Sequence, residues 1–454
     1  MRPTRSFAAD GPAHAAVARV ALRPAALVRV ARPLAALSLA AGAALAAEPA
    51  LRTDLSLRAE ARQASAAGPL TAAGALQPDL KTAAADTATW QAELRGARHL
   101  RLGSRALGVH GNVWLAREHA AHGAEEDRSR INELHATLDA GAWQFAAGKK
   151  VLSWDVGYGF RPNDLVQQEE RRTLWGQTPE GRPLVQAEYF SADTAWSLVA
   201  VQPERWHDTA DTQRFAREAA LAGRVYRRAG AWDLHGFVRH GRHSGASVGA
   251  AVAWVATDEL ELHASLRAVR RHDAWRTDAS VPAASLLQHN PWQVRTVTGG
   301  SQALLGASWT GQLQQSLLVE AWHDGQAPSA AQWRDWTARN RALASLPLQP
   351  GWPAALRAAV AGNLAWQATP LQSIHLHRDN LFVRLAWQPD AWTASLDALV
   401  TPVDRGRIVT ASLQWQGDRW RLVGSWRQHG GPAAAVFSQL PVRRNLGLAA
   451  SVAL

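Results

Sequence analysis

Period-two alternation, repeated along most of the chain, constrains the fold more than any other feature of the sequence. In the segment 409–426, apolar residues alternate with Thr, Ser, Gln and Arg on both sides of a Gly417-Asp418 turn. Similar alternation recurs in the segments 132–147, 185–201, 214–239, 248–270, 303–319 and 381–400. Such alternation gives each strand one apolar and one polar face. The sequence therefore predicts an all-β protein built from antiparallel hairpins.

The placement of tryptophan distinguishes a membrane barrel from a soluble β-protein. In each predicted hairpin, the Trp nearest the short turn shares the face of the apolar residues. Nine residues have this position: Trp143, Trp196, Trp232, Trp254, Trp309, Trp387, Trp392, Trp415 and Trp420. Indoles at a common distance from the turns are typical of the aromatic girdle at a membrane interface. The alternative, core tryptophans of a soluble protein, gives no reason for that common distance.

The lengths of the connections agree with a membrane barrel. Short turns alternate with long predicted connections, at 62–86, 119–129, 152–183, 203–213, 272–300, 323–378 and 429–443. Outer-membrane barrels combine short periplasmic turns with long external loops. Beyond the N-terminal region, no run approaches the roughly 18 to 20 apolar residues that a transmembrane helix needs. We expect residues 47–454 to form one closed antiparallel transmembrane β-barrel of about 18 strands, or 16 if 51–61 is not a strand.

The first 46 residues have the order of an export signal. Several arginines precede the apolar stretch Leu34–Ala44, and Ala44-Leu45-Ala46 supplies small residues for cleavage. We therefore expect residues 1–46 to be a signal peptide, the alternative being an Ala-rich amphipathic segment of a cytoplasmic protein. Removing this segment lowers the formal net charge from +11 to about +6. The remaining arginines are scattered rather than gathered in one patch, so we expect no binding to nucleic acid.

The end of the chain also alternates. Leu446, Leu448, Ala450, Val452 and Leu454 continue the apolar parity to the last residue. This pattern resembles the terminal-strand signal that the barrel-assembly machinery reads in Gram-negative bacteria. The resemblance implies two partners, that machinery during insertion and outer-membrane lipid afterwards, and the cell outer membrane as the location.

One predicted connection is unusually dense in glycine, aromatic and charged residues. It runs from Gly148 to Asp164, and its candidate site residues are Trp154, Asp155, Gly157, Tyr158, Arg161, Pro162 and Asp164. The segment resembles a pattern of porin-like and alginate-export-like outer-membrane barrels, in which a basic strand end leads into aromatic and glycine residues and then Pro-x-Asp. We expect this loop to fold inward and constrict the channel. The alternative is a latch that holds an external loop.

The polar parity of each strand predicts which charged side chains face the lumen. The candidate lumen residues are Arg239, Arg267, Arg384, Asp397, Arg419, Arg421 and Arg427. Guanidinium groups in a confined channel bind carboxylate, phosphate or sulfate. One interpretation is therefore an arginine track that guides anions. The other is a hydrated wall whose mixed charges pair across strands.

Two functions fit this sequence. The first is a channel for small hydrophilic solutes, with a preference for anions, and the second is an export or assembly barrel for a secreted polymer or peptide. We expect no enzyme, because spacing assigns no orienting acid to Ser244 and the nearby His243. We expect no cofactor and no metal, because the chain lacks cysteine and no carboxylate is expected near the pair His375 and His377.

Overall fold

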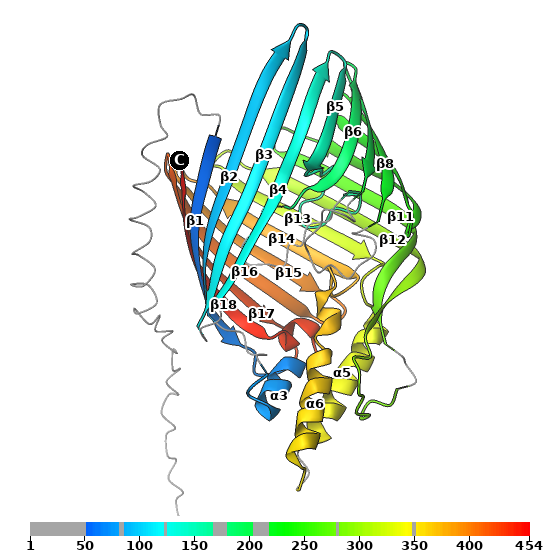
Figure 1. Cartoon of the computed structure of the whole chain (residues 1–454), viewed down its shortest axis with the longest axis vertical. Helices are drawn as coiled ribbons and strands as arrows, with labels where there is room; N and C mark the ends of the chain where they lie inside the picture. Colours follow the sequence, from blue (N-terminus) through cyan, green and yellow to red (C-terminus); the bar gives the residue numbers. More distant parts are fainter. Residues whose placement is uncertain are drawn as a thin grey trace, which may run out of the picture. The chain divides into compact units, whose positions relative to one another are not determined.

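The computed structural model describes residues 51–80, 86–121, 125–166, 179–202, 218–277, 281–346 and 351–454, so the expected signal peptide lies outside the described residues. The unit Pro49–Leu454 contains one antiparallel sheet of 18 strands, in which strands consecutive in the chain are paired. The sheet closes because the first strand pairs with the last (Figure 1). The predicted closed barrel is confirmed, with 18 strands rather than 16.

The strands are β1 (Leu51–Ala64), β2 (Thr87–Leu102), β3 (Arg105–Ala120), β4 (Glu125–Ala140), β5 (Trp143–Lys150), β6 (Arg182–Phe190), β7 (Thr194–Val201), β8 (Ala220–Ala229), β9 (Trp232–Gly241), β10 (Gly245–Val255), β11 (Leu260–Arg276), β12 (Gln293–Thr310), β13 (Gln315–Asp324), β14 (Asp379–Trp387), β15 (Trp392–Thr401), β16 (Gly406–Gln416), β17 (Trp420–Gly430) and β18 (Val442–Ala453).

The connections differ in length at the two ends of the barrel. At one end, each connection spans two to four residues. Gly141 and Gly230 occupy such turns with φ of 72° and 62°, a backbone conformation that favours glycine. At the other end the connections include 151–181, 277–292 and 325–378, although those after β3, β9 and β15 are short. The predicted long connection 119–129 is therefore wrong, because β3 and β4 extend into it. We call the two ends the short-turn end and the long-loop end.

The outer face of the barrel carries the apolar parity of the strands. All nine predicted tryptophans lie at, or within two residues of, a strand end that adjoins a short turn. Neighbouring strands bring some of them into register, and the Trp232 and Trp254 rings stack with their centroids 4.9 Å apart. Trp392 is likewise paired with Trp415. These indoles form the expected aromatic belt at the short-turn end.

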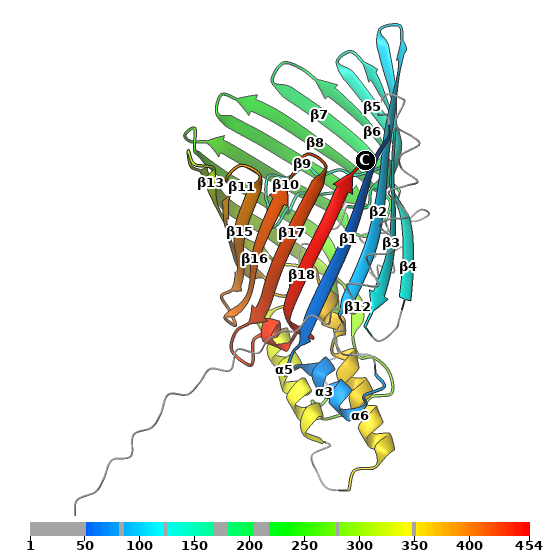
Figure 2. The ribbon, with the colours of Figure 1, turned by 90° about the vertical axis from the view of Figure 1, so that its left-hand side faces the viewer.

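The predicted long loop 323–378 contains two helices that the sequence analysis did not anticipate. These are α5 (Ala330–Ser345) and α6 (Ala354–Trp366), and they pack with α3 (Pro69–Leu76) beyond the long-loop end of the strands (Figure 2). Leu343, Val360 and Leu364 are fully buried in the core of this helical cluster. Two short 3₁₀ helices, η4 (Thr369–Gln372) and η5 (Val436–Gln439), also lie in the long connections. Within the described residues, every helix is too short or too polar to cross a membrane.

Candidate channel constriction

Residues 151–166, which follow β5, form a segment that we call the inward loop. Its apolar side chains Leu152, Trp154 and Leu165 are buried in one cluster with residues of five successive strands. Those wall residues are Leu184, Val199, Val201, Ala222, Phe237 and Ala251. Alternate positions of the same strands face outward, since Val199 is 0% exposed whereas Leu198 is 54% exposed. The inward loop therefore packs against the inner face of the wall.

A buried carboxylate of β13 holds the tip of the inward loop. Glu320 is 0% exposed and accepts hydrogen bonds from the backbone N–H groups of Tyr158 at 2.6 Å and Gly159 at 2.5 Å. The Nε2 atom of His263, on β11, lies 2.9 Å from the same carboxylate. Because β5 and β13 are eight strands apart in a closed sheet of 18, they lie almost opposite each other. The inward loop therefore runs along the inner wall from β5 to the far side of the barrel.

A second anchor joins the inward loop to β11. The Nδ2 atom of Asn163 donates hydrogen bonds to Oγ of Ser265 at 2.9 Å and to the carbonyl oxygen of Leu266 at 3.0 Å. Arg267, which is 3% exposed, donates from Nη1 to the carbonyl oxygen of Pro162 at 3.0 Å. Asn163 and Arg267 are both buried, so these hydrogen bonds form away from solvent.

Two buried carboxylates organise the inward loop internally. Asp164 accepts a hydrogen bond from the backbone N–H of Trp154 at 2.9 Å. Asp155 accepts hydrogen bonds from the backbone N–H of Asn163 at 2.6 Å and the hydroxyl of Ser265 at 2.8 Å. Burial raises the pKa of both carboxyls, and that of Asp164 reaches about 6 although its hydrogen bonds oppose the shift.

The remaining residues of the inward loop shape its turn. Arg161 donates from Nε to the carbonyl oxygen of Gly157 at 2.7 Å, and its Nη1 lies 3.8 Å from Oδ2 of Asp164. A Cβ atom at position 157 would collide with the carbonyl oxygen of Phe160, so only glycine fits this turn. The structure thus brings all seven predicted loop residues into one compact segment.

Solved structures share this architecture, although no family model and no curated protein matches the sequence. The structure of OccAB1 from Acinetobacter baumannii matches with a TM-score of 0.51 and 8% identity, over 89% of this chain and 95% of that one. The outer membrane protein opdK from Pseudomonas aeruginosa matches with a TM-score of 0.50 and 10% identity, over 89% of this chain and 98% of that one. This chain shares the barrel fold of these two proteins. Identities this low show the common fold alone.

Two of the predicted lumen arginines, Arg239 and Arg267, are buried inside the barrel. Arg267 contacts the inward loop, as described above. Arg239 lies 2.8 Å from the carboxylate of Glu218 and donates a hydrogen bond to Oγ of Ser244 at 2.7 Å. Arg239 and Ser244 hold the pKa of Glu218 below its ordinary value, although burial opposes this shift. These two arginines therefore fix loops in place rather than line an open passage.

Of the other predicted lumen arginines, one lies on β14 and the rest lie on β17 or in the turn before it. Arg384 donates from Nη1 to the hydroxyl oxygen of Tyr158 at 2.8 Å, and the same atom lies 3.5 Å from Asp397. Arg427 donates from Nε to Oγ1 of Thr410 at 2.8 Å. Arg421 is exposed, at an inward-facing position by strand parity, and Arg419 is exposed in the adjoining short turn.

The strand register places several of these side chains in one row. Six residues on consecutive strands from β14 through β18 to β1 are paired in this order: Arg384, Asp397, Thr410, Arg427, Asn445 and Arg62. We call this set the charged row. Three of its members are arginines and one is a carboxylate. Arg62 also pairs with Glu60, at 2.8 Å from Nη2.

The sequence analysis missed the residues that dock the inward loop. Glu320 and Asn163 were not among the candidate site residues. The sequence could have indicated Glu320 as an inward-facing residue. It is the single carboxylate between the apolar residues Leu317 and Trp322, and it lies on the inward-facing side of β13. Nothing in the sequence links it to Tyr158, which is 162 residues away.

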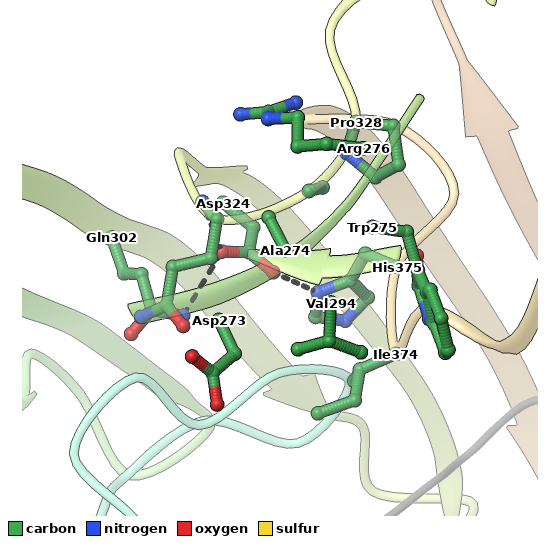
Figure 3. A pocket seen from close by; sticks show the side chains of 13 residues that line it. Asp273, Ala274, Trp275, Arg276, Val294, Gln302, Asp324, Pro328, Ile374 and His375 are labelled. Carbon is green, nitrogen blue, oxygen red and sulfur yellow. Dashed lines mark hydrogen bonds and ion pairs between the residues drawn. The ribbon is translucent and has the colours of Figure 1, made fainter. Parts of the chain in front are cut away.

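The histidines of the long loops do have carboxylate partners, so the expectation that none lies near them is wrong. Figure 3 shows His375 beside Asp324 in a pocket at the long-loop ends of β11 and β13, where its Nδ1 lies 2.7 Å from the carboxylate. Gln302 donates to the same carboxylate at 3.0 Å (Figure 3). His377 lies 2.8 Å from Asp404. Within the described ranges, no three such side chains form a group that could hold a metal ion.

Proposed function

We propose that this protein is an outer-membrane channel for small hydrophilic solutes, with a preference for anions. The observation that carries the proposal is the charged row on β14 to β18 and β1. The inward loop makes its hydrogen bonds with β10, β11, β13 and β14. It therefore narrows the lumen from one side, and the charged row lies mostly on strands that the loop does not bind, β15 to β18 and β1.

The sign of the charge on these strands supports the preference for anions. The nearest inward carboxylates, Asp397 and Glu60, each pair with an arginine. Arg427 adds a positive charge within the row, and Arg421 adds another toward the short-turn end. The Debye length at physiological ionic strength is about 8 Å, so these charges act across a narrow passage but not across a wide one. Guanidinium groups also bind carboxylates and phosphates bidentately.

The test is a reversal-potential measurement on the purified barrel in a planar bilayer under a KCl gradient. We expect anion selectivity in the wild type, strongest in dilute salt. The double variant Arg419→Ser and Arg421→Ser should shift the reversal potential toward cations, because both residues are exposed and can be removed without opening a buried ion pair. Arg407→Ser, at an exposed position on the other parity of β16, is the matched control and should leave the reversal potential unchanged.

Three results would contradict this proposal. Cation selectivity in the wild type, or an equal shift in the control variant, would mean that the arginines are paired wall residues. A folded barrel that conducts nothing would favour the second function, export or assembly of a secreted polymer or peptide.

A further inference from the structure

A groove lies between α5 and the connections that follow β15 and β17. Its volume is about 460 Å³, within the range of sites that hold small organic ligands. One wall is a single face of α5, which includes Arg334, Thr337 and Arg341. The other wall includes Val403 and Val436. The groove is separate from the inward loop and the charged row.

The second wall of the groove is rigid because Asp404 binds it together. This carboxylate accepts hydrogen bonds from Oγ1 of Thr401 at 2.6 Å and from the backbone N–H groups of Gly406 and Val436, each at 2.9 Å. His377 contacts it as well. Although burial opposes the shift, these donors hold the pKa of Asp404 well below its ordinary value. Asp404 is therefore ionised at neutral pH and already engaged by donors of the protein. The second wall is therefore ordered before any ligand binds.

The α5 wall carries two arginines without partners. Arg334 and Arg341 are seven residues apart, so they lie on one face of the helix about 10 Å apart along its axis. Both are exposed. In the ranges that the structure describes, neither guanidinium has a hydrogen bond or an ion pair. The groove therefore offers two guanidinium groups that are free to bind a ligand. Asp404, its single carboxylate among the described lining residues, already accepts hydrogen bonds from the protein.

The opposite wall presents apolar side chains beside Asp404. Val403 is 53% exposed, and Ala434 is also exposed, so both present hydrocarbon surface to the groove. Ala338 supplies a small apolar side chain between the two arginines on α5. A ligand that fits such a site carries a negative charge at one end and an apolar body at the other.

We propose that this groove binds a small amphipathic carboxylate, with the carboxylate on Arg334 or Arg341 and the hydrocarbon body against Val403 and Ala434. Charge complementarity selects the anion, and the apolar wall selects against small inorganic anions. The site lies at the long-loop end and does not depend on conduction. It would collect such solutes at the mouth of the barrel whether or not the charged row carries ions.

The experiment uses the full chain refolded in detergent micelles and isothermal titration with hexanoate. We expect saturable binding to the wild type. The double variant Arg334→Ala and Arg341→Ala should bind hexanoate at least tenfold more weakly. Because this variant is measured in the same micelles, the comparison also corrects for partitioning of hexanoate into the detergent. Arg357→Ala removes an exposed arginine of α6 that does not line the groove, and it should bind as the wild type does. Heat-modifiable mobility on gels confirms that each variant is folded.

Three further measurements test the ligand class. Acetate should bind at least tenfold more weakly than hexanoate, because it lacks the apolar body, and hexylammonium should not bind. Val403→Asp places a negative charge on the apolar wall and should abolish hexanoate binding. Absence of saturable binding, equal binding of hexylammonium, or an equal loss in Arg357→Ala would overturn the proposal. Binding of phosphorylated lipid A without any binding of hexanoate would also overturn it, in favour of a site for membrane lipid.

Discussion

The side-chain amide of Asn163 occupies the space that a side chain at position 249 would need. Gly249 lies on β10, and a Cβ atom there would overlap Oδ1 of Asn163. The glycine thus leaves a notch in the inner wall. Because Asn163 enters this notch, its Nδ2 can reach the carbonyl oxygen of Leu266 at 3.0 Å. The wall of the barrel is shaped to receive the inward loop, as well as to span the membrane.

This relationship predicts the effect of Gly249→Ala. The added methyl group would expel Asn163 from the notch and break its hydrogen bonds to β11, which should destabilise the docked loop by about 1–3 kcal/mol. We expect larger and noisier single-channel conductance in planar bilayers. Gly111→Ala is the control, because a Cβ atom at that position meets nothing within 4 Å. Identical recordings from the two variants would show that the notch does not hold the loop.

Glu320 gives a second prediction about the same loop. Glu320→Ala leaves the N–H groups of Tyr158 and Gly159 without their acceptor and removes the partner of His263. Loss of charge-assisted hydrogen bonds in a buried site should cost roughly 3 kcal/mol or more of docking free energy. We expect frequent transitions to a higher conductance level. Glu259→Ala, in a short turn, is the control and should show the conductance of the wild type. If Glu320→Ala showed no additional transitions, Glu320 would not hold the inward loop in place.

The strands and the aromatic belt were predictable because they depend on local pattern alone. Alternation decides which face of a strand is apolar, and the position of a Trp relative to its turn decides its depth in the membrane, whatever the partner strand is. The helices of the long loops were missed for the same reason. Trp333, Trp336 and Leu343 are buried on α5, and their spacing is that of one face of a helix. Because a strand pattern repeats every two residues, a search for strands does not detect this spacing.

The contacts inside the lumen were predictable only in part. Parity placed Arg267 and Arg384 on the inner face, and composition marked the inward loop. Which residues meet there depends on how the sheet closes and where the loop crosses it. The contact between Asn163 and Ser265 joins residues 102 positions apart. The same limit applies to His377 and Asp404, which spacing along the chain could not bring together.

The carboxyl group of Asp164 predicts how docking of the inward loop depends on pH. Burial raises its pKa from 3.8 to about 6 in the docked loop. A raised carboxyl pKa means that the docked state binds the proton more tightly than the undocked state does. Its contribution to docking is therefore fully present below pH 3.8 and is lost as the pH rises through about 6, by at most about 3 kcal/mol.

We therefore expect fewer spontaneous conductance transitions at pH 4 than at pH 7. Asp164→Asn removes this titrating group, and its recordings should change less across this interval than those of the wild type, with Asp155 as the remaining buried carboxyl of raised pKa in the loop. Asp258→Asn, at an exposed position in a short turn, should keep the wild-type dependence. If Asp164→Asn retained the full dependence on pH, another group would have to control docking.

The last prediction concerns the outer face of the barrel, where two leucines form a matched pair. Leu305 is 68% exposed on β12, four residues before Trp309 of the aromatic belt and between Ala264 and Ala321 of the neighbouring strands. Leu313 is 76% exposed in the short turn after the same strand. Arginine at the bilayer midplane costs roughly 2–4 kcal/mol, whereas near the interface it costs about 0–1 kcal/mol. Leu305→Arg should therefore lower the free energy of unfolding from lipid vesicles by several times more than Leu313→Arg. Equal effects of the two substitutions would mean that Leu305 does not face the hydrocarbon core of the membrane.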